Sequence, residues 1–228
     1  MIEVIGEEGT SEYMAATAVA EALGILWRGI EKSPREEELI RISSSVQISG
    51  YEVSDIDIVV AGIFSNNRRF IPRLLVHDMR GNRVIRRQVL VKNLVVAIEV
   101  KEHDESGTRV TNDNVSVRYK GGWKSATDQN IKQVHSVSAF AKDLGSDIYV
   151  HRCLVMAGIG KLRVNGAVCA GFDGIDFLSN IAAVGKVRKG AGGYVLASGA
   201  NEDVRRFFNA SIFQQVKPTA LDRRKMEA

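Results

Sequence analysis

The chain has 228 residues, of which 45% are hydrophobic and 25% charged, and its formal net charge is +4. This length can bury a full core as one domain or as two small ones, and the composition is that of a globular protein rather than a disordered chain. The mildly basic balance permits nucleic-acid binding without requiring it.

Several classes of protein and site are excluded at this level. No apolar run approaches the length of a membrane span, and the acidic stretch Met1–Glu8 lacks the basic region of a signal peptide, so we expect a cytoplasmic protein. Cys153 and Cys169 are the only cysteines, too few to build a zinc site, and both lie in apolar surroundings. We expect them to be free, buried thiols.

The first predicted element is a helix over residues 10–24, with Thr10 or Ser11 as its N-cap and Gly24 as its end. Glu12 lies in the first turn. Two interpretations of Glu12 are open. An acid is favourable near the positive end of a helix, and the same carboxylate could instead reach the edge of a metal site.

Strands follow at residues 39–43 and 46–49, and a third begins within residues 53–60. In this third strand Asp55 and Asp57 alternate with two isoleucines, so both acids lie on one face. Asp is depleted in strands. The pattern is therefore unusual for a strand whose only role is to fill the core.

Residues 65–92 are predicted to form a basic hairpin that turns at residues 80–83. Its only acid is Asp78, and a solvated charged face is one interpretation of it. Because the hairpin falls between two acidic strands, we expect it to project beside the acids and to bind phosphates. Its basic residues are Arg68, Arg69, Arg73, Arg80, Arg83, Arg86, Arg87 and Lys92.

Residues 95–101 read as a buried strand in which an apolar run ends in Glu99, Val100 and Lys101. Glu99 and Lys101 share one face, and such residues are rarely buried unless they are paired. Taken alone, the pair is most simply a strand-end ion pair. If this strand lies beside Asp57, two carboxylates meet and repel each other unless a cation such as Mg²⁺ or Mn²⁺ bridges them.

The rest of the chain alternates between helical and strand-like patterns. A helix is predicted over residues 125–144, with Ser125 or Thr127 as its cap and Gly145 as its stop, and Gln129 and Gln133 share a face of it. Its predicted buried stripe comprises Ile131, Val134, Val137, Ser138, Phe140 and Ala141. Beyond it we expect strands at residues 148–157 and 161–170, a short helix at 173–184, a flexible basic loop at 186–193 and a last helix at 202–216 capped by Asn201.

Asp57 and the later Glu99-x-Lys101 resemble the core motif of the PD-(D/E)xK nucleases, and within that superfamily the chain is most similar to the nuclease-related domain called NERD. Further motifs carry the resemblance: the start of the first helix at residues 9–12, the segment 119–133 and the tail at 218–227. The resemblance implies an α/β restriction-endonuclease-like fold, with a central mixed β-sheet flanked by helices and the basic hairpin as an addition to it.

The resemblance also implies the site. Mg²⁺ or Mn²⁺ would be held by Asp57, Glu99 and Glu12, and Lys101 would orient the attacking water. The family pattern of an apolar residue, Asp and then an aliphatic run selects Asp57 over Asp55. Gln129 and Gln133 would complete the catalytic set, and Lys132 beside them would bind nucleic acid.

The implied activity is metal-dependent hydrolysis of DNA, with RNA not excluded. Residues 1–216 would be the nuclease domain and 217–228 a linker toward a helicase or ATPase domain, in a protein that processes DNA or defends against foreign DNA. A homo-oligomer is also possible, and no membrane contact is expected. The alternative is a catalytically degenerate module that binds nucleic acid or oligomerises within a multidomain ATPase.

Overall fold

The computed structural model describes residues 2–28, 39–70, 73–78, 81–86, 88–111, 114–157, 169–170, 187–190 and 193–210. Its helices are α1 (Ser11–Arg28), α2 (Ala126–Asp143) and α4 (Asn201–Phe208). Its strands are β1 (Ile2–Ile5), β2 (Leu39–Gln47), β3 (Asp55–Phe70), β4 (Arg73–Asp78), β5 (Gly81–Arg86), β6 (Val89–Lys101), β7 (Thr108–Thr111), β8 (Asn114–Tyr119), β9 (Gly122–Ser125), β10 (His151–Met156), β11 (Cys169–Ala170), β12 (Val187–Gly190) and β13 (Gly193–Leu196).

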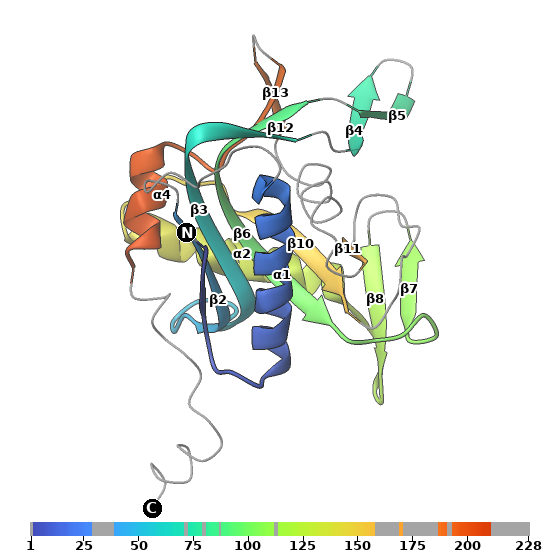
Figure 1. The fold of residues 1–228 in the computed structure, drawn as a ribbon. Helices are drawn as coiled ribbons and strands as arrows, with labels where there is room; N and C mark the ends of the chain where they lie inside the picture. The colour runs from blue at the N-terminus through green and yellow to red at the C-terminus, as the bar shows by residue number, and fades with distance from the viewer. Residues whose placement is uncertain are drawn as a thin grey trace, which may run out of the picture.

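The described strands form a mixed eight-stranded sheet around β6, with the order β1-β2-β3-β6-β10-β11 (Figure 1). The long strands β3 and β6 are antiparallel, whereas β10 runs parallel to β6. β13 pairs with the first residues of β6, and β12 pairs with β13. The fold is therefore α/β with a mixed central sheet, as the sequence predicts.

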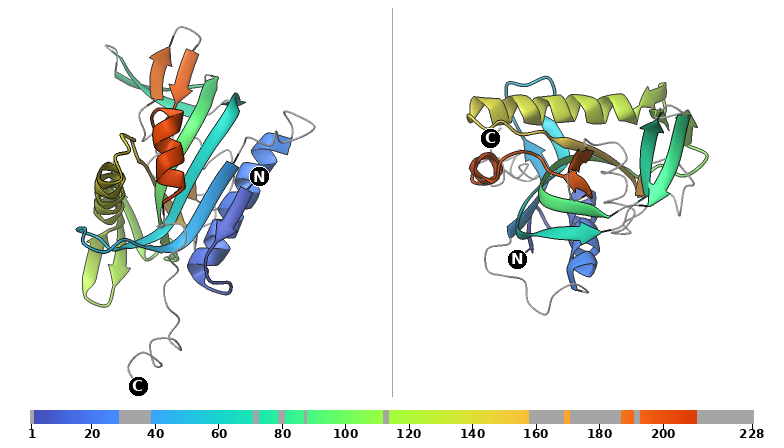
Figure 2. Two further views of the ribbon diagram at one scale, coloured as in Figure 1. Left: turned by 90° about the vertical axis from the view of Figure 1, so that its left-hand side faces the viewer. Right: turned by 90° about the horizontal axis from the view of Figure 1, so that it is seen from above.

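Helices cover both faces of this sheet, as Figure 2 shows. On one face Ala16, Val19 and Leu23 of α1 pack against Ile58 and Ile98, among others. On the opposite face α2 and α4 cover Val59 and Ala97 in a second core cluster. Because apolar side chains on both faces of β3 and β6 are buried, the central strands are nearly continuous hydrophobic runs. Within the described residues, none of the helices is long and apolar enough to cross a membrane.

Two smaller sheets lie outside the main one. β4 and β5 form an antiparallel hairpin between the end of β3 and the start of β6, which agrees with the hairpin predicted there. β3 continues to Phe70 and β6 begins at Val89, so the hairpin strands are shorter than the predicted insertion. β7, β8 and β9 form a three-stranded antiparallel sheet beside the C-terminal part of β6 (Figure 1). Val115 and Val117 of β8 pack under it against Leu154 and Met156.

The helix starts are mostly as predicted, whereas two helix ends and one cap differ. The last helix, predicted to reach residue 216, ends at Phe208 with Asn209 as its C-cap. Thr10 caps α1 by accepting a hydrogen bond from the Tyr13 N–H at 3.1 Å, but the helix continues through Gly24 to Arg28, because a single glycine costs a helix only about 1 kcal/mol. Ser125 caps α2, accepting from the Asp128 N–H at 3.0 Å. At α4 the N-cap is Ala200 rather than Asn201. The Asn201 side chain instead accepts a hydrogen bond from the Asn93 amide at 2.7 Å.

Two predicted strand patterns also need correction. Residues 39–43 and 46–49 are not separate strands, since β2 runs without interruption from Leu39 to Gln47. The basic, glycine-rich segment 186–193 was expected to be a flexible loop, yet β12 and β13 form an antiparallel hairpin there that pairs with β6. The predicted helix at 173–184, residues 211–216 of the last helix and the tail at 217–228 lie outside the described residues.

Candidate active site at the end of the central strands

The site begins with Glu99 and Lys101 at the end of β6. Alternation along the strand places both side chains on the face covered by α2, while Val100 packs toward α1. Glu99 is fully buried and Lys101 is 9% exposed, and the Lys101 ammonium contacts Glu99 Oε1 as an ion pair. The predicted pairing of these two residues is thus confirmed. A buried ion pair of this kind loses hydration energy, so further polar contacts are expected around it.

Those contacts come from α2. The Gln133 side-chain amide donates a hydrogen bond to Glu99 Oε2 and another, at 3.4 Å, to the backbone carbonyl of Asp55. Asn130, one turn earlier, donates to the Gln133 Oε1 at 3.3 Å and to the Ala97 carbonyl at 3.1 Å. Both amides are buried. Because Asn130 gives its NH₂ group to the Gln133 oxygen, the Gln133 NH₂ group is directed toward Glu99.

Asp57 reaches the same place from β3. Val59 pairs with Ala97 across the two antiparallel strands, and both pack on the α2 side. Asp57 lies two residues before Val59 and Glu99 two residues after Ala97, so both acids lie at the same end of the sheet. Side-chain alternation is interrupted in β3 at this point, since Ile56 packs in the cluster on the α2 side and Ile58 in the cluster on the α1 side. Asp57 Oδ2 accepts a hydrogen bond from the Val100 N–H at 2.8 Å, which extends the pairing of β3 with β6 through a side chain.

This crowding perturbs the titration of the pair. Burial and, second, the negative charge of Asp57 raise the pKa of Glu99 to about 7, because Lys101 and Gln133 only partly offset these two effects. Burial acts to lower the pKa of Lys101, but the Glu99 carboxylate outweighs it, so this pKa is raised above its ordinary value. Lys101 is therefore a fixed positive charge near neutral pH, while Glu99 is close to its titration point.

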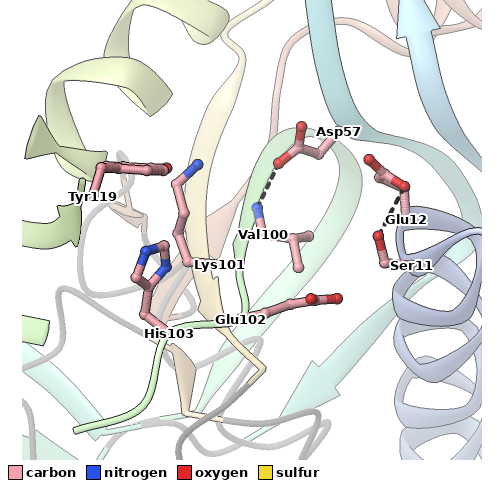
Figure 3. Close-up of a pocket in the computed structure, with 8 residues that line it drawn as sticks. All are labelled: Ser11, Glu12, Asp57, Val100, Lys101, Glu102, His103 and Tyr119. Carbon is pink, nitrogen blue, oxygen red and sulfur yellow. Dashed lines mark hydrogen bonds between the residues drawn. The ribbon is translucent and has the colours of Figure 1, made fainter. Parts of the chain in front are cut away.

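A cavity of about 350 Å³ opens at this end of the sheet (Figure 3). Asp57 and Glu12 border one side of it and Lys101, His103 and Tyr119 the other. Glu12 is held by the start of α1, where it accepts a hydrogen bond from the Ser11 hydroxyl at 3.1 Å. The full lining comprises Ser11, Glu12, Asp57, Val100, Lys101, Glu102, His103 and Tyr119. Three remote segments of the chain thus bring acids and a lysine to one hollow.

The donor set at the cavity suits a hard cation that keeps much of its water. Mg²⁺ is commonly held by one or two carboxylates, with waters and substrate oxygens completing its shell. Within the described residues no group of three or more His, Cys, Asp and Glu side chains is arranged to hold an ion by itself. The two protein carboxylates of such a site would be Asp57, which borders the cavity, and Glu99, which is fully buried and does not itself line the cavity. Glu12 would lie at the rim of the site.

Some predicted site residues do not reach this place. Gln129 is exposed on α2, although the buried Gln133 lies only one turn further along the helix. The two side chains do not share an environment, because the helix buries Asn130 and Gln133 but turns position 129 to solvent. Lys132 is also exposed and forms a 3.0 Å ion pair with Glu52. Asp55 is exposed and accepts a hydrogen bond from Gln47, so Asp57 and not Asp55 borders the cavity.

The basic hairpin lies at the wrong end of the sheet for the predicted role beside the acids. Asp57 is near the start of β3 and Glu99 near the end of β6, and β4 and β5 join the opposite ends of these two strands (Figure 1). The ten residue-to-residue steps from Val89 to Glu99 span about 33 Å along an extended strand. The expectation of direct proximity is therefore wrong. The side chains of Arg68, Arg69, Arg73, Arg83 and Arg86, and all of Arg87, lie outside what the structure describes.

Sequence reasoning missed two neighbours of the site. The sequence pattern does not predict the burial of Asn130, because polar helix residues usually face solvent. The predicted buried stripe of α2 gave Val137 and Ala141 correctly, but Ile131 and Val134 are only partly buried, while Asn130, Gln133 and Ser136 are fully covered. The sequence indicates Tyr119 only as the first residue of the motif at 119–133. Its position at the cavity follows from the β8–β9 turn.

Comparisons with known proteins do not assign the chain to a group. No family model matches it, and neither the curated proteins nor the solved structures contain a match. The residues and their arrangement are therefore the basis for any functional statement.

Proposed function

We propose that this chain is a Mg²⁺- or Mn²⁺-dependent nuclease that hydrolyses DNA phosphodiester bonds with a PD-(D/E)xK-type site. The observation that carries the proposal is the convergence of Asp57, Glu99 and Lys101 at one end of the β3–β6 pair, next to a cavity. A core that needed only apolar packing would gain nothing from two mutually repelling carboxylates there.

Asp57 and Glu99 fit a divalent cation by their chemistry. Each offers a carboxylate, and the pKa of Glu99 is raised first by its burial and second by the negative charge of Asp57. A bound cation would offset the repulsion between the two carboxylates, acidify a coordinated water and neutralise the charge that develops on the phosphate.

The other residues have roles that follow from their contacts. Lys101, positively charged at neutral pH and facing the cavity, would orient the attacking water and stabilise the phosphate oxygens in the transition state. Its raised pKa argues against use as a general base. Gln133 would hold the Glu99 carboxylate in one orientation, and Glu12 would orient water from the opposite side of the cavity.

The proposal extends to the protein as a whole. The nuclease unit would occupy residues 1–216, and the remaining tail would lead toward a helicase or ATPase domain or support a homo-oligomer. Processing of DNA or defence against foreign DNA is the proposed setting, with RNA as a further possible substrate.

The test is cleavage of supercoiled plasmid and end-labelled linear DNA by the purified chain in Mg²⁺, in Mn²⁺ and in EDTA. We expect cleavage with either ion and none in EDTA. Lys101→Met is expected to abolish cleavage, and Lys142→Gln serves as the matched control, because Lys142 is exposed at the distant end of α2. Absence of cleavage by the wild type with both ions, or full activity of Lys101→Met, would reject the proposal.

A further inference from the structure

The sheet formed by β7, β8 and β9 carries only positive charge in its described part. Residues 108–111 and 114–125 include Arg109, Arg118, Lys120 and Lys124 and no Asp or Glu, and the one acid of the segment, Asp113, falls in sequence between β7 and β8. All four side chains are exposed, and none of them forms an ion pair within the described residues. A solvated sheet that served only to pack against the core would be expected to carry charges of both signs.

This sheet is fixed against β10 and α2, next to the candidate site. Val115 and Val117 of β8 are buried against β10. The Thr127 hydroxyl of α2 accepts a hydrogen bond from the Val115 N–H at 2.9 Å. The strand therefore has a fixed relation to β10 and α2, which also position Glu99 and Gln133. Its last residue, Tyr119, lines the cavity together with Lys101 and Asp57.

Tyr119 is one of the few large hydrophobic side chains that are exposed in the described structure, at 39%. Its ring meets the His103 ring edge to face, with centroids 5.1 Å apart, and the Lys124 ammonium lies 5.3 Å from its centroid. His103 is tied back to β8 by a 3.1 Å hydrogen bond between its Nε2 and the Arg118 carbonyl. An aromatic ring with a cation beside it is thus fixed at the mouth of the cavity.

An exposed aromatic ring with the Lys124 ammonium beside it, on a sheet that also carries Arg109, Arg118 and Lys120, matches one class of ligand in particular. Phosphates of a nucleic-acid strand are attracted by the lysines and arginines, and an unpaired base can stack on the tyrosine ring. In an intact duplex each base face is covered by its neighbours, so the ring can stack only on a base that is unpaired, terminal or turned out of the helix.

We propose that β7–β9 is the surface that holds the nucleic-acid strand next to the scissile phosphate, with Tyr119 stacking on an unpaired base. The assignment rests on the proposed function, because it is the nuclease reaction that gives the neighbouring phosphate its place in the cavity. The substrate class it specifies is a single strand, or a duplex with a frayed or flipped nucleotide at the cut.

The test is fluorescence anisotropy with a labelled single-stranded oligonucleotide and a labelled blunt duplex of the same length, in EDTA so that no cleavage occurs. We expect the wild type to bind the single strand more tightly. Tyr119→Leu should weaken single-strand binding by about fivefold to a hundredfold and duplex binding by much less, because one stacked base is lost. Tyr119→Phe keeps the ring and should bind as the wild type does.

The charged part of the surface is tested separately with the double variant Lys120→Gln/Lys124→Gln, which removes the cation beside the Tyr119 ring and the one that follows Tyr119 in the chain. Its binding should be weaker for both ligands, and the slope of log affinity against log salt should fall by about 1 for each phosphate contact removed. Lys142→Gln removes the same type of charge about 24 Å along α2 from its first residue and should change neither measurement.

The outcomes separate this inference from the proposed function. Unchanged single-strand binding by both Tyr119→Leu and the double variant, or no binding by the wild type, would overturn the inference even if Mg²⁺-dependent cleavage is observed. Loss of binding in these variants with no cleavage under any ion would support the surface and reject the nuclease. Equal weakening by Lys142→Gln would show a non-specific charge effect and would also overturn the inference.

Discussion

The two ends of the β3–β6 pair carry opposite chemistry. At one end Asp57 and Glu99 converge beside Lys101 and a cavity, and at the other the strands continue into the arginine-rich hairpin of β4 and β5. About 33 Å of strand separates them, which is well beyond the reach of a direct contact. Two charged motifs that are neighbours in sequence can therefore lie far apart, because a long strand separates them.

The acid end borders a cavity and contains the buried Glu99–Lys101 ion pair, so it is where chemistry is proposed. The hairpin end would at most hold a distant part of a long substrate. The β7–β9 sheet, which lies at the acid end, carries the cations that can contact a strand near the cut. Substitutions at the two ends should therefore have effects that differ in size and in their dependence on substrate length.

The largest effect is expected from Asp57→Asn. The amide oxygen can still accept the Val100 N–H hydrogen bond, so the fold should survive, but a carboxylate for the cation is lost. We expect cleavage to fall by about a thousandfold or more, the cost of removing a major source of transition-state charge stabilisation. Single-turnover cleavage with Mg²⁺ measures it, and circular dichroism verifies folding. Activity within about tenfold of the wild type would remove Asp57 from the site.

The pH dependence of stability distinguishes the acid end from the hairpin, because arginines do not titrate in the accessible range. With the pKa of Glu99 raised to about 7, the folded state binds more protons than the unfolded state between about pH 4.5 and 7. The contribution of Glu99 to the free energy of unfolding is therefore fully present below pH 4.5. It is lost as pH rises through 7, by up to about 3 kcal/mol.

His151 opposes this trend, since burial lowers its pKa to about 4. Its contribution is present above pH 6.5 and is lost as pH falls toward 4, by a similar amount of about 3 kcal/mol. Metal-free wild type should therefore show a nearly flat profile. His151→Phe should become more stable as pH falls from 7 to 5, and Glu99→Gln less stable over that range. Urea denaturation at each pH tests this, and parallel slopes in the two variants would contradict it.

A smaller effect is expected from Asn130→Ala, which should reduce cleavage by about tenfold to a hundredfold. Losses of this size are typical when a residue that orients a metal ligand through hydrogen bonds is removed. The Gln133 amide would lose the hydrogen bond that directs its NH₂ group toward Glu99. The neighbouring Gln129→Ala is the matched control, because Gln129 is exposed and should be silent. The measurement is kcat at saturating Mg²⁺ with stability determined in parallel. A loss of stability with unchanged kcat would make Asn130 structural only.

The sequence predicted those parts of the site that depend on local periodicity. Alternation along β6 paired Glu99 with Lys101, because a strand has only two faces. Alternation along β3 predicted Ile56 and Ile58 on the face opposite to both acids, but these two isoleucines pack on opposite sides of the sheet. Asn130 could not be predicted, because its burial depends on which face of α2 meets the polar end of the sheet. Hydrophobic periodicity favoured Ile131 and Val134, but the helix turns amides toward the buried Glu99.

The errors at larger scale have a single physical origin, which is that local patterns do not specify strand direction. The hairpin was expected beside the acids because it lies between them in sequence. Once β3 and β6 are antiparallel, a connection between them must leave from the end opposite to Asp57 and Glu99. The same limitation explains the segment 186–193. Its glycines and basic residues locally predict a loop, but pairing of β13 with the distant strand β6 makes it part of the sheet.

The smallest effect is expected from the hairpin variant Arg73→Gln/Arg83→Gln/Arg86→Gln. A strand advances about 3.4 Å per nucleotide in a stacked helix, so about ten nucleotides are needed to cover the 33 Å between the two ends. Substrates that extend fewer nucleotides from the cut cannot contact both ends of the β3–β6 pair. On these substrates the kcat/KM of the variant should stay within about twofold of that of the wild type. Longer substrates should lose a few-fold in KM at low salt, with kcat unchanged, because distant phosphate contacts contribute uniform binding. A large loss of kcat on short substrates would mean that the hairpin reaches the site after all, and the contrast between the two ends would fail.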